Sequence, residues 1–263
     1  LNGKIVKHKH WADRVIFDYA ISFIQKHQNK PFFAYISSLT CHSPLRAPRG
    51  FIEKYKAKGL SDNLATLYAM VEHLDFHVDR VLLKVKELGL EKNTVIIFMS
   101  DNGPAINFSR LSDKDREIRY VNNYKGHKGN IWENGVKSPL FIRWPGTFEP
   151  QIINRLIDVT DLYPTIAELA VAEYPDKQLP LDGTTFLDIL KGKTLKTDTK
   201  QSFNYAHFGW QPSDLPYDPA GRFEEYKPVT PEKKKNLTLD HYAISVQNQE
   251  YKLMYQPKKY PNT

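Results

Sequence analysis

The sequence predicts an α/β fold with a mostly parallel sheet flanked by helices, followed by a small C-terminal antiparallel β appendage. Three observations support this prediction: helices alternate with short apolar strands, polar clusters directly follow the strands, and the alternation weakens after about Gly183. Such alternation is typical of layered α/β proteins, in which helices cover the faces of a sheet. We expect the α/β part to span residues 1–195 and the appendage residues 196–263.

The longest predicted helix runs from about Asn63 to Leu88. Its apolar residues recur at steps of three and four, which places them on one helical face: Leu64, Leu67, Val71, Leu74, Val78, Val81, Val85 and Leu88. Ser61 is an N-cap candidate, and Gly89 is suited to end the helix. A coiled coil shows the same stripe, but a strand follows at once, which favours a buried amphipathic helix.

Other elements follow the same alternation. Helical spacing covers residues 13–27, and the apolar run Phe32–Ile36 is interpreted as a strand buried on both faces. Residues 94–99 and 140–144 are the next expected strands.

The C-terminal half contains one more helix and a hairpin. Asp161 and Pro164 are suited to start a helix. Residues 242–246 and 251–255 are expected to pair as a hairpin around residues 248–250.

The composition narrows the function classes. The net charge of +7 favours either an anionic partner or a solvated surface with surplus lysine. Zinc-finger spacing and an RNA-binding aromatic ladder are both missing from the sequence, so we expect no nucleic acid partner. No apolar run is long enough for a membrane span. The single cysteine, Cys41, excludes an internal disulfide framework.

The first polar cluster is Ser100-Asp101-Asn102-Gly103, directly after the strand 94–99. A carboxylate beside a carboxamide supplies two hard oxygen ligands, which suit calcium or magnesium. Asp-Asn-Gly is also common in turns, but a rigid strand end can hold such ligands in place. Ligands of open α/β sheets bind beyond the carboxyl ends of the strands, so Asp101 and Asn102 are candidate metal ligands.

The second cluster, Thr40 to Leu45, contains His42 and follows the strand 32–36. A histidine in this position can donate to an oxyanion or protonate a leaving group. The alternative is a loop histidine bonded to backbone.

The third cluster runs from Tyr124 to Gly129 and contains Lys128. Gly126 and Gly129 remove side-chain bulk around the lysine, so that backbone and ammonium can both approach an anion. The GxxxxGK[ST] spacing of a nucleotide P-loop is not met. The alternative is a surface lysine in a flexible loop, although Trp132 and the following strand favour an anchored loop.

In this order, the three clusters resemble the formylglycine-dependent sulfatases of the alkaline phosphatase superfamily, over most of residues 10–195. The segments that look like family landmarks are His42-Ser43-Pro44, Ser100-Asp101-Asn102-Gly103, Gly126-His127-Lys128-Gly129 through Pro139, Asp161-Leu162-Tyr163-Pro164-Thr165 and Leu181-Asp182-Gly183.

The resemblance implies an incomplete alkaline phosphatase-like fold with calcium bound by Asp101 and Asn102. It also implies that His42 and Lys128 contact the sulfate group. In the family, a hydrated formylglycine attacks sulfur while metal and lysine neutralise the sulfuryl oxygens. His42 is then a candidate acid for the leaving oxygen, whereas Lys125 and His127 are interpreted as neighbouring groups.

The chain departs from the family pattern in two ways. Glu133-Asn134-Gly135 and Lys137 stand where the family usually has Glu-Gly-Gly and arginine. The sequence around Cys41 does not match the Cys-x-Pro-Ser-Arg type of motif from which formylglycine is made, so we interpret Cys41 as a small structural residue. The nucleophile motif and its companion aspartates, lysine and histidine are expected upstream. We therefore expect a sulfatase fragment that is inactive alone.

Two alternatives stay open at this point: a phosphomonoesterase or phosphodiesterase of the same superfamily, and a non-catalytic anion-binding or glycan-binding module. The expected substrate is a sulfate ester, and basic residues near the His42 loop suit a sulfated glycan: Arg46, Arg49 and Lys54. By resemblance, the compartment is periplasmic, extracellular or lysosome-like, although no signal peptide is visible. No pattern indicates an oligomeric state.

Overall fold

The computed structural model describes residues 7–105, 111–118, 124–128, 131–173, 180–193, 203–208, 242–248 and 250–255. The chain forms two compact units, each discontinuous in sequence. The first unit contains Leu1–Ile96, Phe108–Val121 and Ile142–Gly146, and the second contains the remaining residues. The predicted boundary at residue 195 lies outside the described residues and stays a prediction.

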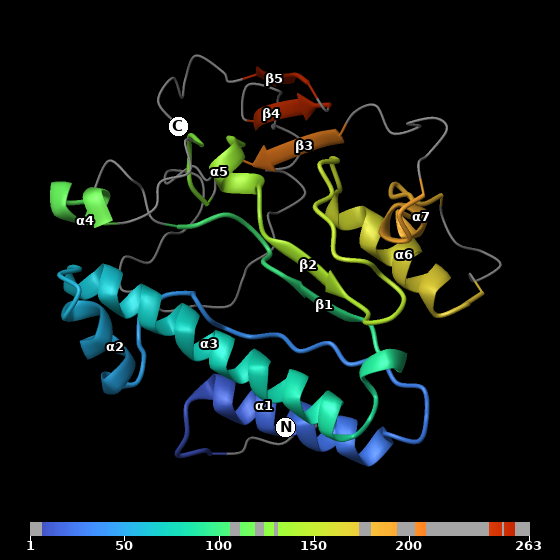
Figure 1. The fold of residues 1–263 in the computed structure, drawn as a ribbon. Helices are drawn as coiled ribbons and strands as arrows, with labels where there is room; N and C mark the ends of the chain where they lie inside the picture. The colour runs from blue at the N-terminus through green and yellow to red at the C-terminus, as the bar shows by residue number, and fades with distance from the viewer. Residues whose placement is uncertain are drawn as a thin grey trace, which may run out of the picture. The chain divides into compact units, whose positions relative to one another are not determined.

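Three helices build the first unit: α1 (Ala12–His27), α2 (Arg49–Lys56) and α3 (Asp62–Glu87). Figure 1 shows α1 and α2 lying along α3. The prediction for the longest helix is confirmed, because Ser61 Oγ accepts a hydrogen bond from the Leu64 amide at 3.5 Å. Gly89 follows the helix with a φ of 69°, the left-handed conformation in which glycine commonly ends helices.

The core of the first unit forms along α3. Phe17 and Ile24 of α1 pack with Val81 and Val85 of α3, and all four are buried. Around α2, a second cluster contains Ala47, Ala69 and Met70, with partly buried side chains packed against it, namely Leu45, Phe51, Ile52 and Tyr55. The short helix α4 (Asp113–Ile118) and the 3-10 helix η1 (Glu91–Asn93) are the remaining described helices of this unit.

The prediction of a strand buried on both faces at residues 32–36 is wrong. The segment is not part of a sheet within the described residues, and its residues alternate between half-buried and exposed. Phe32 and Ile36 pack against the α1–α3 core, whereas the alternate side chains face outward: Phe33 is 70% exposed and Tyr35 83%. The apolar run therefore has one buried face only.

Strands β1 (Ile96–Met99) and β2 (Leu140–Arg143) form a two-stranded sheet. The Ser100 amide after β1 donates to the carbonyl of Pro139 before β2, and Trp144 Nε1 after β2 donates to the carbonyl of Lys92 before β1. The end of one strand thus meets the start of the other, so the two strands are antiparallel. An antiparallel edge strand on an otherwise parallel sheet is common, and the mostly parallel sheet stays a prediction.

The second unit contains the predicted helix after Asp161 as α6 (Leu162–Leu169), preceded by a single 3-10 turn. The Asp161 carboxylate accepts hydrogen bonds from the amides of Asp158 at 2.9 Å and Thr184 at 2.8 Å. A Cβ on Gly183 would lie 2.0 Å from the Thr160 carbonyl oxygen. The backbones of residues 158–161 and 183–184 are therefore in close contact. The short helix α7 (Leu187–Leu190) begins a few residues later.

The second unit ends in a three-stranded antiparallel sheet of β3 (Phe203–Phe208), β4 (Tyr242–Gln247) and β5 (Lys252–Tyr255). The predicted hairpin is confirmed, with Ile244 opposite Tyr255. Asn248 Oδ1 holds the turn by accepting hydrogen bonds from the backbone amides of residues 250 and 251. Within the described residues, no helix combines the length and apolar character that crossing a membrane requires.

Candidate active-site loops

Asp101 and Asn102 lie at the turn after β1, as the sequence predicts. Asp101 is exposed and Asn102 is half-buried. Within the described part of the chain, neither side chain makes a hydrogen bond or an ion pair. Ser100 Oγ donates to the Asn102 carbonyl at 3.1 Å, which stabilises the turn through its backbone. Among the described residues, no partner therefore occupies the carboxylate and carboxamide oxygens.

Gly103 is required by a close approach of two backbone segments. Its amide donates to the Gly135 carbonyl at 3.0 Å. A Cβ at position 103 would lie 1.8 Å from the Asn134 carbonyl oxygen, where no side chain fits. The sequence predicted a turn glycine here, and the structure adds the neighbour that excludes any other residue.

Lys128 lies beside this turn. Its amide donates to the Pro104 carbonyl at 2.7 Å, so its backbone is adjacent to the segment that contains Asp101 and Asn102. The residue is half-buried, and its ammonium has no hydrogen-bond or ion-pair partner in the described part of the chain. Gly126 has a φ of 94°, which glycine adopts readily. Gly129, the second glycine of the predicted cluster, lies outside the described residues.

Asn134 is the site residue that the sequence did not reveal. It lies in the short helix α5 (Glu133–Val136) and is 2% exposed. Its side-chain amide donates to the Gly126 carbonyl at 2.9 Å, and its backbone amide donates to the Lys125 carbonyl at 3.0 Å. Two adjacent residues of α5 therefore contact the two loops: Asn134 bonds to the loop of Lys125 and Gly126, and Gly135 bonds to Gly103.

An ion pair connects α5 to the C-terminal sheet. Lys252 Nζ in β5 lies 2.8 Å from Glu133 Oε1, with the lysine side chain 14% exposed and the glutamate side chain 30%. The pair is part-buried, so solvent screens it less than a surface pair.

His42 belongs to the first unit, whereas Asp101, Asn102 and Lys128 belong to the second. It is exposed, and its Nδ1 donates to the Ser43 carbonyl at 2.9 Å. The alternative interpretation of His42, a loop histidine bonded to backbone, agrees with this contact. The contact uses Nδ1, and Nε2 is the other ring nitrogen. The meeting of His42 with Lys128 stays a prediction.

Cys41 has the environment of an unreactive thiol. Burial of the thiol, with a smaller effect of the nearby Asp13 carboxylate, raises its pKa to about 11, although the residue as a whole remains exposed. A thiol with this pKa is almost fully protonated at neutral pH and is a weak nucleophile.

The described residues contain no cluster of three His, Cys, Asp or Glu side chains arranged to hold a metal. Asp101 and Asn102 are thus the candidate ligands that the turn after β1 supplies, and their oxygens are of the type that calcium prefers.

The chain matches the sulfatase family over residues 3–172 and the C-terminal region of N-sulphoglucosamine sulphohydrolase over residues 126–262. Mouse steryl-sulfatase is 30% identical over 74% of this chain and 30% of that protein. The uncharacterized sulfatase YdeN of Escherichia coli is 27% identical over 97% of the chain and 45% of that protein. The chain spans about a third of the length of several of these curated relatives.

Several solved structures have the same fold, and some of them are described as sulfatases. The crystal structure of Ps i-CgsB superposes with a TM-score of 0.69 at 23% identity, covering 99% of this chain and 49% of that one. The complex of Ps i-CgsB with k-i-k-neocarrahexaose gives a TM-score of 0.68 at 22% identity, covering 97% of this chain and 50% of that one. The fold is therefore that of the solved sulfatases, whose shared architecture is alkaline phosphatase-like.

Proposed function

Because the chain belongs to the sulfatase family, we propose that the whole protein hydrolyses a sulfate ester and that residues 101–128 supply half of its active site. The observation that supports this proposal most strongly is the Lys128 amide bonded to the Pro104 carbonyl at 2.7 Å. It brings the backbone of Lys128 next to the segment of Asp101 and Asn102, and within the described residues none of these three side chains has a hydrogen-bond or ion-pair partner.

Asp101 and Asn102 are proposed to bind calcium. Their hard oxygen donors fit that ion, and within the described residues their side chains have no hydrogen bond that would need to break. When bound, calcium supplies positive charge that stabilises the sulfuryl oxygens. Calcium takes about six to eight oxygen ligands, so two protein ligands leave most of the shell unfilled. We expect calorimetric titration of this chain alone to detect no sub-micromolar calcium binding; such binding would show that further ligands exist.

Lys128 is proposed to bind the sulfate group through its ammonium. A compact ammonium suits a tetrahedral oxyanion, and its stabilising effect grows as negative charge develops on the oxygens. His42 is proposed to donate a proton from Nε2 to the leaving oxygen while Nδ1–H stays on the Ser43 carbonyl. This role requires the doubly protonated ring.

The main experiment substitutes Lys128 in the whole protein. Lys128→Ala should lower kcat/KM for a fluorogenic aryl sulfate by roughly 10²- to 10³-fold, the usual scale for one group that stabilises transition-state charge. Lys125→Ala is the matched control on the same loop and should cost much less. Equal losses in the two variants would contradict the assignment. Phosphate esters assayed in parallel should be poorer substrates, and a preference for phosphate would favour a phosphatase of the superfamily.

The chain of 263 residues should show no turnover alone. Its sequence contains no Cys-x-Pro-Ser-Arg or Ser-x-Pro-Ser-Arg motif from which a formylglycine could form, and without that nucleophile no covalent step is available. The purified chain is assayed with the same aryl sulfate, with Cys41→Ala as the control. Turnover that survives this substitution would refute the expectation, and turnover that disappears with it would make Cys41 the nucleophile.

We also propose that the whole protein contains the predicted mostly parallel sheet. The outward face of residues 32–36 is apolar, and Phe141 in β2 is 66% exposed. Such side chains are normally covered by a neighbouring layer or strand. Amide hydrogen exchange at residues 33–36 should be slower in the whole protein than in this chain, and equal exchange would contradict a larger sheet there.

A sulfated glycan is the proposed substrate class. Ps i-CgsB, which shares the fold, was solved with neocarrahexaose. Of the basic residues near the His42 loop, Lys54 lies 2.5 Å from Glu72 and Arg49 lies 3.8 Å from Glu53. Glu53 and Glu72 thus partly offset the positive charges of Arg49 and Lys54. Of the three basic residues predicted to bind the glycan, Arg46 is therefore the one for which no acidic partner is found among the described residues.

A further inference from the structure

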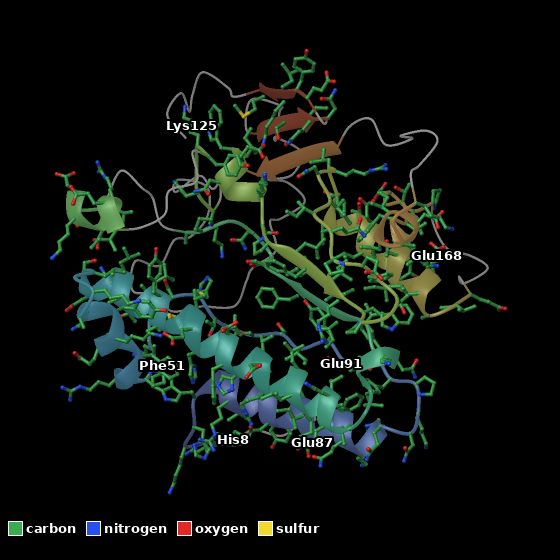
Figure 2. All side chains as sticks on the ribbon, in the orientation of Figure 1. His8, Phe51, Glu87, Glu91, Lys125 and Glu168 are labelled. Atoms are coloured by element: carbon green, nitrogen blue, oxygen red, sulfur yellow. The ribbon has the colours of Figure 1, made fainter. Side chains whose placement is uncertain are left out.

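Two lysines on the active-site loops lie over aromatic rings. Lys137 Nζ is 4.4 Å from the centre of the Tyr124 ring and donates to the Tyr124 hydroxyl at 2.7 Å. Lys125 Nζ is 4.2 Å from the centre of the Trp132 ring. Figure 2 shows Lys125 beside α5. Each ammonium is thus oriented by an aromatic ring, an interaction worth about 0.5–1 kcal/mol at exposed sites.

Neither of these lysines has a carboxylate partner in the described part of the chain. Both are exposed, and Tyr124 is 40% exposed. On the same short helix, by contrast, Glu133 pairs with Lys252. Within the described residues, the two lysine–aromatic pairs therefore present positive charge to solvent with no acidic group to offset it.

The position of the pairs connects them to sulfate binding. Tyr124 and Lys125 precede Lys128 by a few residues, and Lys137 directly follows α5. The buried Asn134 fixes both segments to one another through the carbonyls of Lys125 and Gly126. The hydrogen bonds of the buried Asn134 thus restrain the spacing between the pairs and Lys128.

We propose that Lys137 with Tyr124, assisted by Lys125 with Trp132, forms a subsite for a second acidic group of the substrate. The substrate class is then a glycan with a further sulfate or carboxylate near the sulfate that is removed. The ammonium groups bind the acidic group, and the exposed tyrosine ring offers an apolar face to the sugar. This inference rests on the proposed function and specifies its substrate.

The test compares two substrates of the whole protein: a monosulfated aryl ester and a sulfated oligosaccharide with several acidic groups. Lys137→Gln should lower the ratio of kcat/KM for the oligosaccharide to kcat/KM for the aryl ester by about 3- to 10-fold, the scale for one exposed charged contact. Lys137→Arg should retain most of the ratio, because it keeps the charge. Lys193→Gln, which removes a lysine paired with Asp188 on α7, is the control and should leave the ratio unchanged.

A purely structural role of Lys137 would affect both substrates alike, and an unchanged ratio would overturn the proposal. Calorimetric binding of the oligosaccharide to the same variants gives a result that does not depend on turnover. Weaker binding by Lys137→Gln than by Lys137→Arg supports the subsite even if no sulfate ester is hydrolysed, and equal binding by the two overturns it. Absence of aryl sulfate turnover in the unmodified protein would instead count against the proposed function.

Discussion

Gly103 allows a strong test of the way the two active-site loops meet. In Gly103→Ala, the new Cβ would lie 1.8 Å from the Asn134 carbonyl oxygen and 2.7 Å from its carbonyl carbon. Ordinary van der Waals contact begins at 3.4 Å, so the segments must move about 1.6 Å apart. Both partners are backbone atoms, and no flexible side chain can move away instead.

A movement of this size breaks the Gly103–Gly135 hydrogen bond, whose length is 3.0 Å. Overpacking costs about 1–3 kcal/mol, and a buried donor left without an acceptor costs about 1–3 kcal/mol more. We therefore expect Gly103→Ala to lower the free energy of unfolding of the whole protein by about 2–6 kcal/mol. Aryl sulfate turnover should fall as well, because Asp101 and Lys128 separate.

Urea unfolding monitored by circular dichroism measures the first effect. The matched control is Gly50→Ala in α2, where an added Cβ meets nothing within 4 Å. Because alanine favours a helix more than glycine does, this control should be stabilised by about 0.5–1 kcal/mol. If Gly103→Ala unfolds at the same urea concentration as the unmodified protein, the close approach of the two segments is refuted.

Three further predictions use other parts of the structure. Burial, with smaller effects of His73 and Arg80, lowers the pKa of His77 in the folded protein. As the pH falls, the His77 ring is therefore protonated more readily in the unfolded state, so the urea midpoint should fall below about pH 6.5. The fall should be smaller in His77→Gln, which removes the titrating ring. A double-mutant cycle with Glu133→Gln and Lys252→Met should give a coupling energy of about 0.5–3 kcal/mol for the unfolding free energy. Additive effects of the two substitutions would contradict a stabilising ion pair. Alkylation of Cys41 by iodoacetamide should stay slow at pH 8 and accelerate toward pH 11; rapid reaction at pH 8 would contradict the raised pKa.

Elements whose signal is local were predictable from the sequence. The α3 helix has a long apolar stripe, an N-cap serine and a terminal glycine, and each signal acts within a few residues. The hairpin of β4 and β5 is similar, because Asn248 and the flanking alternation define it. Both predictions agree with the structure.

Elements whose environment depends on distant residues were not predictable. Residues 32–36 are all apolar or aromatic, which suits a strand buried on both faces. Burial depends, however, on which layers cover the segment, and only its inner face packs against α1 and α3. The direction of β2 relative to β1 likewise depends on the path of the loop between them, which apolar periodicity does not specify.

The candidate site divides in the same way. Asp101, Asn102 and Lys128 follow recognisable motifs, and the structure places their backbones together in one unit. Asn134 could be recognised only as a departure from the Glu-Gly-Gly pattern, because its hydrogen bond to Gly126 joins residues eight positions apart, which no local sequence signal specifies. The placement of His42 relative to these residues remains a prediction.

The ion pair between Glu133 and Lys252 joins residues separated by 119 positions. A ribosome makes the chain from its N-terminal end, so Lys128 and its loop emerge long before the strand that supplies Lys252. The loop therefore gains this restraint only after β5 has emerged and paired with β4. The maturation of this half of the site is consequently tied to β5, and a ribosome that stalls before Lys252 releases a loop that lacks this support.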